Sequence, residues 1–490
     1  MSQQLKLLIV LLVGVNVAIV GWLLLRPATP SPSGAVQNAA VLDDLLKDNT
    51  MEAARYDLSD SADTLNVIFI SLDALRYDRT GASGNSDGLT PNLDAFAEEA
   101  VVFHDATAAA PWTLPSHMSI WTGRWPSIHT VTNKLTPLSG GKMVEASLSA
   151  GIQTYPDLLI RSGRIAAGFT GGAGVQNKYG FGRDFETYLD DRYFGGLDYS
   201  IPAALEWLGD RRDVPFFLFL HGYDVHGQFD LPESKRSSIG YDGALTGSIE
   251  EQGELREKGL GNINEPGDPA HLQGTLDADD AAYLAAIYDR KVADADERLG
   301  SFLSQLKTMG LYDRSIIVIF SDHGDEFMEH NGLDHGATLY QEQVHVVSMI
   351  RFPDYGRRQD IRTPMRTIDL FPTVFDALGL EGPSRVDGTS LLPLLRGEAM
   401  DLDVFAESDY RLFVHHRMTR DGPYKLILDL LDGKRELYNL ADDAGERQDI
   451  SSQDPRRTYE MEQELRTWLE ASKTNPQDYL GLEETPITIF

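Results

Sequence analysis

Two apolar segments of the sequence each end in residues that could bind a metal. Asp73 closes the run at residues 65–73, and Asp322 and His323 follow a second run that starts at Ser315. In α/β sheets the carboxyl ends of parallel strands meet at one edge, where ligands bind. A buried carboxylate without a partner is costly, so two aspartates and an imidazole at that edge suit one divalent cation. The pattern therefore predicts a metal site made by Asp73, Asp322 and His323.

The histidines of the chain are concentrated around this predicted site. A single histidine is usually structural, and a single aspartate at a strand end is usually a helix cap or a turn residue. The histidines that fall in loops after predicted strands or beside Thr113 are His117, His129, His221, His226, His323, His330 and His335, out of 12 in the chain. This concentration favours one functional site over a set of unrelated structural residues.

Thr113 begins the segment TLPSH, which is predicted to start a helix. A helix N-terminus stabilises negative charge, and Pro115 in the first turn loses no hydrogen bond there. A hydroxyl beside a divalent cation loses its proton more easily. The chain has no cysteine, which excludes a thiolate nucleophile. Thr113 is therefore the predicted nucleophile.

Strands and helices alternate along the segment that carries these residues. Short apolar runs rich in branched side chains are typical of strands that are buried on both faces of a parallel sheet. The predicted strands are residues 65–73, 165–170, 215–221, 315–322 and 345–350, and helical patterns lie at residues 90–100 and 279–306. This order predicts an α/β sandwich with a mostly parallel central sheet.

Two later regions depart from that alternation. Residues 228–275 are polar and lack sustained periodicity, so we predict an insertion near the site. Residues 424–440 read as two strands joined at Asp432-Gly433, a hairpin signal, and a helix is predicted near residues 455–472. The sequence therefore predicts a small C-terminal α+β subdomain over residues 386–490.

The N-terminus contains an apolar run at residues 7–25, within a predicted anchor at residues 5–25. The run is long enough to span a bilayer core of roughly 30 Å and is longer than the apolar region of a cleavable signal peptide. A Pro/Ser/Ala-rich linker follows, over residues 26–64. We expect one transmembrane helix, with the catalytic body outside the cytoplasm on the periplasmic or extracellular side.

The formal net charge of −32, from 75 acidic and 43 basic residues, restricts the partners of the body. Such a surface repels nucleic acid, so we expect no nucleic-acid binding. An anionic substrate must then be held by a local positive source, such as a metal ion, histidines or a helix N-terminus.

Several motifs in succession resemble those of the sulfatase family in the alkaline phosphatase superfamily. They are NVIFISLDALRYDRTG, TPNLDAFAEEAVVFHDA, TLPSHMSIWTG, FLHGYDVHG and SDHGDEFMEHNGLDHGATLY. The resemblance covers roughly residues 65–450 and implies an alkaline-phosphatase/sulfatase-like sandwich, with a catalytic domain at residues 65–385. The number and order of the motifs make it more specific than one pattern match.

The sequence departs from the formylglycine members of that family at three places. Those enzymes carry Cys or Ser where this chain has Thr113, and Arg where it has His117. Threonine has a methyl group on Cβ and cannot become the formylglycine aldehyde. The family's second aspartate after the first strand is replaced by Ala74, and the later metal pair is Asp322-His323 where many members have Asp-Asn. These departures resemble the threonine branch of the superfamily, in which threonine attacks phosphorus.

The resemblance also implies a role for each site residue. It makes Thr113 both nucleophile and metal ligand beside Asp73, Asp322 and His323. It implies catalytic roles at the substrate and leaving group for His226 and His335, and substrate-side roles for His117, His221 and Lys178. A histidine ligand favours Zn²⁺ or Mn²⁺, whereas the sulfatase resemblance suggests Ca²⁺.

Three functions stay open at this stage. The first is a membrane-anchored hydrolase or transferase of phosphoesters that forms a phospho-threonine. The second is a hydrolase of sulfate esters that works without formylglycine. The third is a non-catalytic binding protein, against which the joint presence of Asp73, Thr113, Asp322, His323 and His335 argues.

Overall fold

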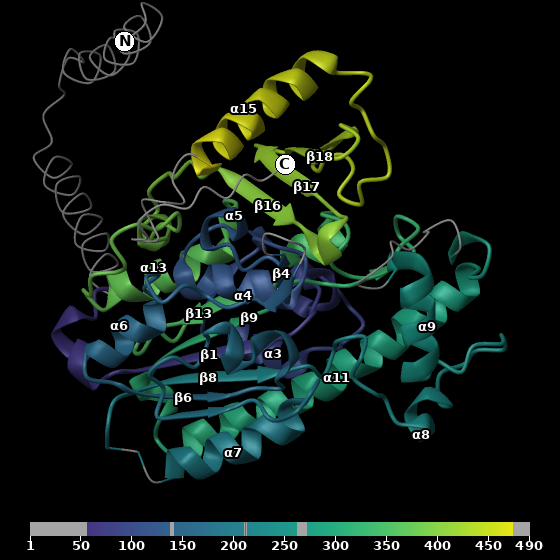
Figure 1. The fold of residues 1–490 in the computed structure, drawn as a ribbon. Coiled ribbons are helices and arrows are strands. Elements are labelled where there is room, and N and C mark those ends of the chain that lie inside the picture. Colours follow the sequence, from purple (N-terminus) through teal and green to yellow (C-terminus); the bar gives the residue numbers. More distant parts are fainter. Residues whose placement is uncertain (1–55, 138–141, 210, 212, 262–271, 474–490) are drawn as a thin grey trace, which may run out of the picture. The chain divides into compact units, whose positions relative to one another are not determined.

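A computed structural model describes residues 56–137, 142–209, 211, 213–261 and 272–473 (Figure 1). Within these residues, no helix combines the length and the apolar character needed to cross a membrane. The predicted anchor at residues 5–25 and most of the predicted linker lie outside the described part of the chain.

The centre of the fold is an eight-stranded sheet. Its strands, in spatial order, are β14 (Gln359–Ile361), β2 (Val101–Phe103), β13 (Ser348–Arg351), β9 (Ser315–Phe320), β1 (Asn66–Leu72), β8 (Phe216–Gly222), β6 (Ile165–Phe169) and β7 (Thr187–Leu189). β13 runs antiparallel to both of its neighbours, and the other pairs are parallel. The predicted mostly parallel sheet is confirmed, and β1, β8 and β9 are buried along their whole length.

The prediction for residues 345–350 was wrong in two respects. The first two residues form β12 (His345–Val346) in a separate three-stranded sheet with β3 (Ala106–Thr107) and β15 (Met365–Arg366). The rest forms β13, which runs against the sheet. Parallel strands need a long crossover, usually a helix. The segment between β9 and β13 holds the short strands β10 (Glu326–Phe327), β11 (Leu333–Asp334) and β12, and its helix, α12 (Gln341–Val344), has only four residues.

Helices cover both faces of the central sheet (Figure 1). Val67 and Phe69 of β1 point into a core shared with α4 (Thr113–Thr122), α6 (Tyr155–Arg161) and α13 (Leu370–Ala377). Ile68 and Ile70 point into the opposite core, shared with α3 (Pro91–Ala97), α7 (Leu197–Gly209) and α11 (Ala278–Thr308). Because strand side chains alternate between faces, the run is apolar throughout and supplies both layers.

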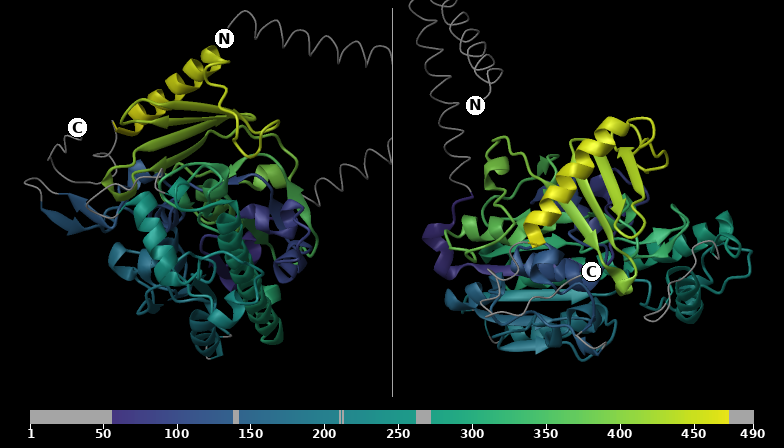
Figure 2. Two further views of the ribbon diagram at one scale, coloured as in Figure 1. Left: turned by 90° about the vertical axis from the view of Figure 1, so that its right-hand side faces the viewer. Right: turned by 45° about the horizontal axis from the view of Figure 1, so that its top comes forward.

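A four-stranded antiparallel sheet follows, with α15 (Pro455–Lys473) lying across it (Figure 2). Its strands are β16 (Val404–Ser408), β17 (His416–Asp421), β18 (Tyr424–Asp429) and β19 (Arg435–Asn439). Leu426 and Leu428 share a core with Met461 and Leu465 of α15. The hairpin turn contains Gly433 at φ 74°, a backbone angle that favours glycine.

The predicted insertion at residues 228–275 contains more regular structure than its sequence pattern indicates. It forms α8 (Glu233–Arg236) and the twelve-residue α9 (Ile249–Leu260). Ser248 caps α9 by accepting a hydrogen bond from Glu251 N. Periodicity missed α9 because only Leu255 and Gly259 along it are buried. Residues 262–271 lie outside the described part.

Shorter elements complete the fold. They are α5 (Pro126–His129), α14 (Leu392–Leu395), β4 (Leu135–Pro137), β5 (Met143–Glu145), β10 (Glu326–Phe327) and β11 (Leu333–Asp334). At the end of the predicted linker, a 3-10 turn spans Ser59–Thr64, and Tyr56 is buried against Phe352 and Tyr355.

Candidate active site

The three predicted metal ligands lie together at the carboxyl ends of β1 and β9, which are neighbours in the sheet. The Nε2 atom of His323 is 3.7 Å from Asp73 Oδ1 and 3.4 Å from Asp322 Oδ2. One ligand atom from each residue lies within 4.8 Å of the others. All three side chains are fully buried, so they face one shared point away from bulk water.

The donor atoms of this group are free to bind a cation. Asp73 Oδ1 and Asp322 Oδ2 are buried and accept no hydrogen bond. His323 Nδ1 donates to the carbonyl oxygen of Gly324 at 2.8 Å, which leaves a lone pair on Nε2. Burial and the neighbouring Asp322 carboxylate raise the pKa of Asp73 well above its ordinary value. Two buried carboxylates and one imidazole lone pair fit a divalent metal ion, which would remove this electrostatic penalty.

Thr113 is the first residue of α4 and is nearly buried. Its Oγ1 atom lies 3.4 Å from His323 Nε2, so the hydroxyl faces the same point as the carboxylates. A loop packs closely on its other side: a Cβ added to Gly174 would lie 2.8 Å from Thr113 Cβ. Glycine at 174 therefore leaves room for the branched side chain of threonine.

His335 and His226 face the group with opposite protonation tendencies. The Nδ1 atom of His335 is 2.6 Å from Asp325 Oδ1 and 2.7 Å from Asp334 Oδ1. Burial disfavours the charged ring, but the two carboxylates outweigh it and raise the pKa of His335 well above its usual range. Burial and the adjacent His335 lower the pKa of His226 well below that range. Two neighbouring histidines whose pKa values are shifted in opposite directions can act as a proton donor and a neutral partner.

The rings of the site are in direct contact with one another. The His335 ring centroid is 4.1 Å from that of His323 and 4.7 Å from that of His226. Phe194 stacks on His226 at 4.9 Å. A leaving group that enters beside His323 would therefore meet both other histidines.

Of the three residues predicted to bind substrate, two lie behind the carboxylates. His117 Nε2 is 2.9 Å from Ser71 Oγ, and its Nδ1 donates to the Thr113 carbonyl at 3.0 Å. His221 Nε2 is 3.2 Å from Asp73 Oδ2. Both rings are fully buried, so they are placed to orient the aspartates and the start of α4.

The structure does not place Lys178 with this group. Its ammonium pairs with Glu145 at 2.5 Å, and its side chain is 42% exposed. Lysine is a flexible, strongly hydrated cation, and the surface carboxylate supplies its partner.

Sequence reasoning missed four residues that support the site: Asp325, Asp334, Phe194 and Arg256. Asp325 stands two residues after His323 in the motif SDHGDE, and that spacing could have suggested a role. Asp334 stands next to His335 in the longer motif SDHGDEFMEHNGLDHGATLY, whereas Phe194, from a loop, and Arg256, from the insertion, carry no local signal.

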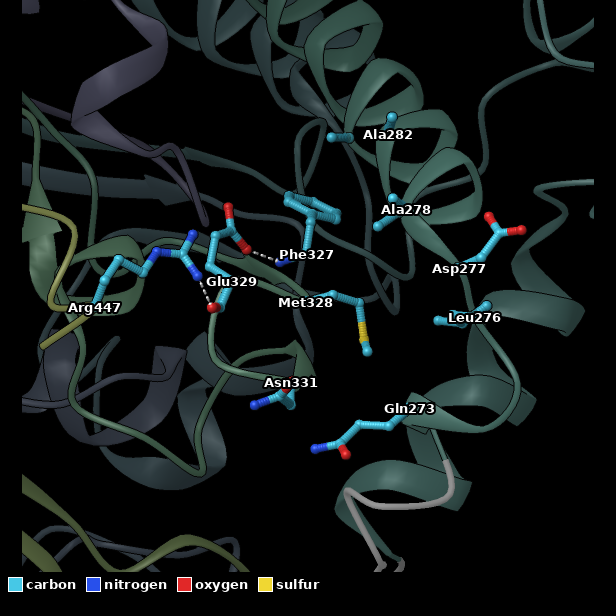
Figure 3. Close-up of a pocket in the computed structure, with 12 residues that line it drawn as sticks. Gln273, Leu276, Asp277, Ala278, Ala282, Phe327, Met328, Glu329, Asn331 and Arg447 are labelled. Atoms are coloured by element: carbon cyan, nitrogen blue, oxygen red, sulfur yellow. Dashed lines mark hydrogen bonds between the residues drawn. The ribbon is translucent and has the colours of Figure 1, made fainter.

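A separate cavity of about 510 Å³ lies between the start of α11 and residues 327–331 (Figure 3). Ala278, Ala282 and Met328 form part of its lining, and Arg447 donates to the Glu329 carbonyl at its rim. None of the predicted metal ligands or catalytic residues lines this cavity. It is therefore distinct from the site described above.

Comparison with known families agrees with this geometry. The sequence profile described as Sulfatase matches residues 65–380, which is more than half of the chain. The chain belongs to the sulfatase family. A second profile, described as N-sulphoglucosamine sulphohydrolase, C-terminal, matches residues 329–475.

Individual relatives place this sulfatase-family protein among hydrolases. It is 22% identical to arylsulfatase K of Xenopus laevis, over 88% of this chain and 87% of the relative. A 2-O GAG sulfatase structure superposes with TM-score 0.64 at 23% identity, covering 86% of this chain and 94% of that one. The phosphonate monoester hydrolase of Agrobacterium radiobacter superposes with TM-score 0.65 at 18% identity, covering 84% and 96%. The protein is thus a sulfatase-like hydrolase.

Proposed function

We propose that this hydrolase cleaves phosphoesters through a covalent phospho-threonine at Thr113. The observation that supports this most is the position of the hydroxyl. Thr113 is the first residue of α4, and its Oγ1 lies 3.4 Å from His323 Nε2, beside the two carboxylate oxygens that accept no hydrogen bond. Because threonine cannot form an aldehyde hydrate, its own oxygen must make the bond.

The residues divide the reaction into two displacements. Thr113 Oγ, with its proton released to solvent, bonds to phosphorus as the bond from phosphorus to the leaving oxygen breaks. His335, charged through its two carboxylate partners, gives its proton to that oxygen. Water then attacks phosphorus, the Oγ–phosphorus bond breaks, and the proton of the water returns to His335. An alcohol in place of water would make the same enzyme a transferase.

Asp73, Asp322 and His323, with Thr113 beside them, would hold one divalent cation. When bound, such an ion lowers the pKa of an adjacent hydroxyl and offsets negative charge on the substrate. We propose Zn²⁺ or Mn²⁺ because imidazole is a ligand, with Ca²⁺ as the alternative.

Sulfate-ester hydrolysis is the second candidate, and the sulfatase relatives favour it. Relatives named for sulfate esters include a delta 4,5-hexuronate-2-O-sulfatase of Bacteroides thetaiotaomicron, 24% identical over 80% of this chain. The objection is chemical: a formylglycine hydrate can expel sulfate by elimination, whereas a sulfated threonine must be hydrolysed. The phosphonate monoester hydrolase on the same fold shows that the fold also serves phosphorus.

A matched substrate panel separates the two candidates. Purified protein with added Zn²⁺, Mn²⁺ or Ca²⁺ is assayed on 4-nitrophenyl phosphate, a 4-nitrophenyl phosphodiester, 4-nitrophenyl phenylphosphonate and 4-nitrophenyl sulfate. We expect the phosphorus esters to be turned over fastest, and acid quenching to trap phosphate on the peptide that contains Thr113. Faster sulfate release, with sulfate trapped on that peptide, would establish the second candidate instead.

We also propose that residues 5–25 anchor the protein in a membrane with its body outside the cytoplasm. The apolar run at residues 7–25 supports this. Full-length protein should stay with membranes after an alkaline wash, and a chain without residues 1–40 should be released. Release of both forms would contradict the anchor.

A further inference from the structure

Arg256 extends from helix α9 of the insertion towards the catalytic histidines. Its Nε atom lies 3.3 Å from Asp334 Oδ2, and its side chain is only 21% exposed. The guanidinium therefore comes from a region without a readable motif and reaches a residue adjacent to His335.

Asp334 is held at both carboxylate oxygens. Oδ1 accepts a hydrogen bond from His335 N at 2.8 Å and lies 2.7 Å from His335 Nδ1. Oδ2 faces Arg256. The backbone of Asp334 has φ 75°, and a left-handed angle is costly for a residue other than glycine. Such a backbone conformation persists only where contacts with neighbouring residues stabilise it. The ion pair with Arg256 is one of those contacts.

Gln228 connects Arg256 to the second catalytic histidine. Its amide orientation is assigned from its neighbours. With the oxygen towards Arg256, Gln228 accepts from Nη1 at 2.8 Å, and its nitrogen faces His226. One arginine thus contacts the partners of both His335 and His226.

We propose that Arg256 is a positioning residue for protonation of the leaving group. It fixes Asp334, and Asp334 together with Asp325 fixes the His335 ring so that Nε2–H faces the leaving oxygen. This inference rests on the proposed function, because it assigns His335 the role of acid. The insertion is therefore part of the catalytic apparatus, in addition to any contact it makes with substrate.

Esters that differ in their leaving group test the role. A 4-nitrophenolate leaves without a proton, whereas an alkoxide needs one. General acid catalysis contributes roughly 10²–10⁴-fold, so Arg256→Met should lower kcat by about 10–100-fold for an alkyl ester and by less than about threefold for the 4-nitrophenyl ester. Arg256→Lys should restore part of the alkyl activity, because it keeps the charge but not the fork geometry.

Arg236 of α8 is the matched control. It belongs to the same insertion and pairs with Asp230 at 2.8 Å, so Arg236→Met should leave the ratio of the two activities unchanged. Equal losses on both esters in Arg256→Met would show a purely structural role and overturn the proposal. Unchanged alkyl activity would overturn it as well.

Proton NMR spectroscopy tests the positioning role of Arg256 without an activity assay. A hydrogen bond between an imidazole N–H and a carboxylate is charge-assisted and short, and its proton signal appears far downfield. We expect such a signal in the wild-type protein, its loss in His335→Gln and a marked upfield shift in Arg256→Met and Arg256→Lys. An unshifted signal in both Arg256 variants would overturn the positioning role. A wild-type protein that turns over no ester would contradict the proposed function. The downfield proton signal would then still test whether Arg256 positions His335 through Asp334.

Discussion

Among the described residues, three groups combine two carboxylates with one histidine at metal-binding distances, and besides Asp325, Asp334 and His335 there are two more. One is the metal group, Asp73, Asp322 and His323. The other, here called the anchor group, is Glu326, His330 and Glu342. The residues of both groups are buried or nearly so. All of them except Asp73 lie in the segment that follows β9. Their composition is nearly the same, but their hydrogen bonding differs completely.

Both ring nitrogens of His330, both carboxylate oxygens of Glu326 and Oε1 of Glu342 have hydrogen-bond partners. His330 Nδ1 is 2.5 Å from Glu342 Oε1, and its Nε2 donates to the Glu446 carbonyl at 2.9 Å. Glu326 Oε1 accepts from the backbone N–H groups of His330 and Gly332, and Oε2 accepts from Gln343 Nε2. The His330 ring also stacks on Tyr340 at 3.6 Å.

The metal group instead leaves a buried oxygen on each aspartate without a hydrogen bond. Groups that already have hydrogen-bond partners gain less from a cation than buried oxygens that accept no hydrogen bond, which are costly until a cation binds. Residue types and distances alone therefore do not identify a metal site. The unused lone pairs are what favours the metal group as the proposed site.

The largest expected effect is at Thr113, the proposed nucleophile beside the metal group. Thr113→Ala should lower kcat by at least about 10³-fold, because the attacking oxygen is removed. Thr113→Ser keeps the hydroxyl and should retain substantial activity. Thr122→Ala, a buried threonine at the other end of α4, is the matched control for helix packing and should change kcat little. Steady-state kinetics with a circular dichroism check distinguishes these outcomes, and near-native turnover by Thr113→Ala would rule out covalent attack.

Metal-linked stability separates the two groups directly. A ligand that binds only the folded state at 100 times its Kd stabilises by about 2.7 kcal/mol. We expect a Zn²⁺ or Mn²⁺ titration to raise the unfolding free energy by this order in the wild type and in His330→Gln. Asp322→Asn should lose the response, since it removes a charged ligand. A response that disappears in His330→Gln and survives in Asp322→Asn would reverse our assignment of the two groups.

Breaking the anchor group should destabilise the protein without touching metal binding. Glu342→Gln removes the carboxylate partner of His330, and charged hydrogen bonds contribute about 1.5–3 kcal/mol. We expect a loss of about 2 kcal/mol in urea unfolding with an unchanged midpoint of metal titration. An altered metal affinity would show that the anchor group also binds the ion.

The smallest effect concerns His129, a buried histidine without a carboxylate. Burial lowers the pKa of His129 to about 3, and its Nε2 is hydrogen-bonded to Ser119 Oγ at 3.0 Å. The unfolded chain binds the proton near pH 6.5 and the folded chain does not, so stability falls as pH decreases below 6.5. From pH 7 to 5.5 we expect a loss of about 1 kcal/mol. This loss should be absent in His129→Gln, and an identical pH profile for both proteins would contradict it.

The sequence predicts best what depends on local pattern. β1, β8 and β9 are continuous apolar runs because both of their faces are buried, and the predicted ligands follow from the ends of those runs. Contacts between segments that are distant in the sequence produce no local sequence pattern. The ion pair between Arg256 and Asp334 joins helix α9 of the insertion to strand β11, and the surface pairing of Lys178 depends on a carboxylate 33 positions earlier, at Glu145. The direction of β13 depends on a missing crossover helix, which an apolar run cannot reveal.

The place of β1 in the sheet has a consequence for the protein during its synthesis. Among the described strands β1 is the first to be made, yet it lies between β8 and β9. Asn66 contacts Phe216 and Ser315, which follow it by 150 and 249 residues. At roughly 5–20 residues per second, a ribosome needs about 8–30 s to reach the first partner and about 12–50 s to reach the second. Throughout that interval a mostly apolar strand is without its neighbours. Slower translation between β1 and β8 should therefore lower the yield of folded chains, and holding chaperones should raise it.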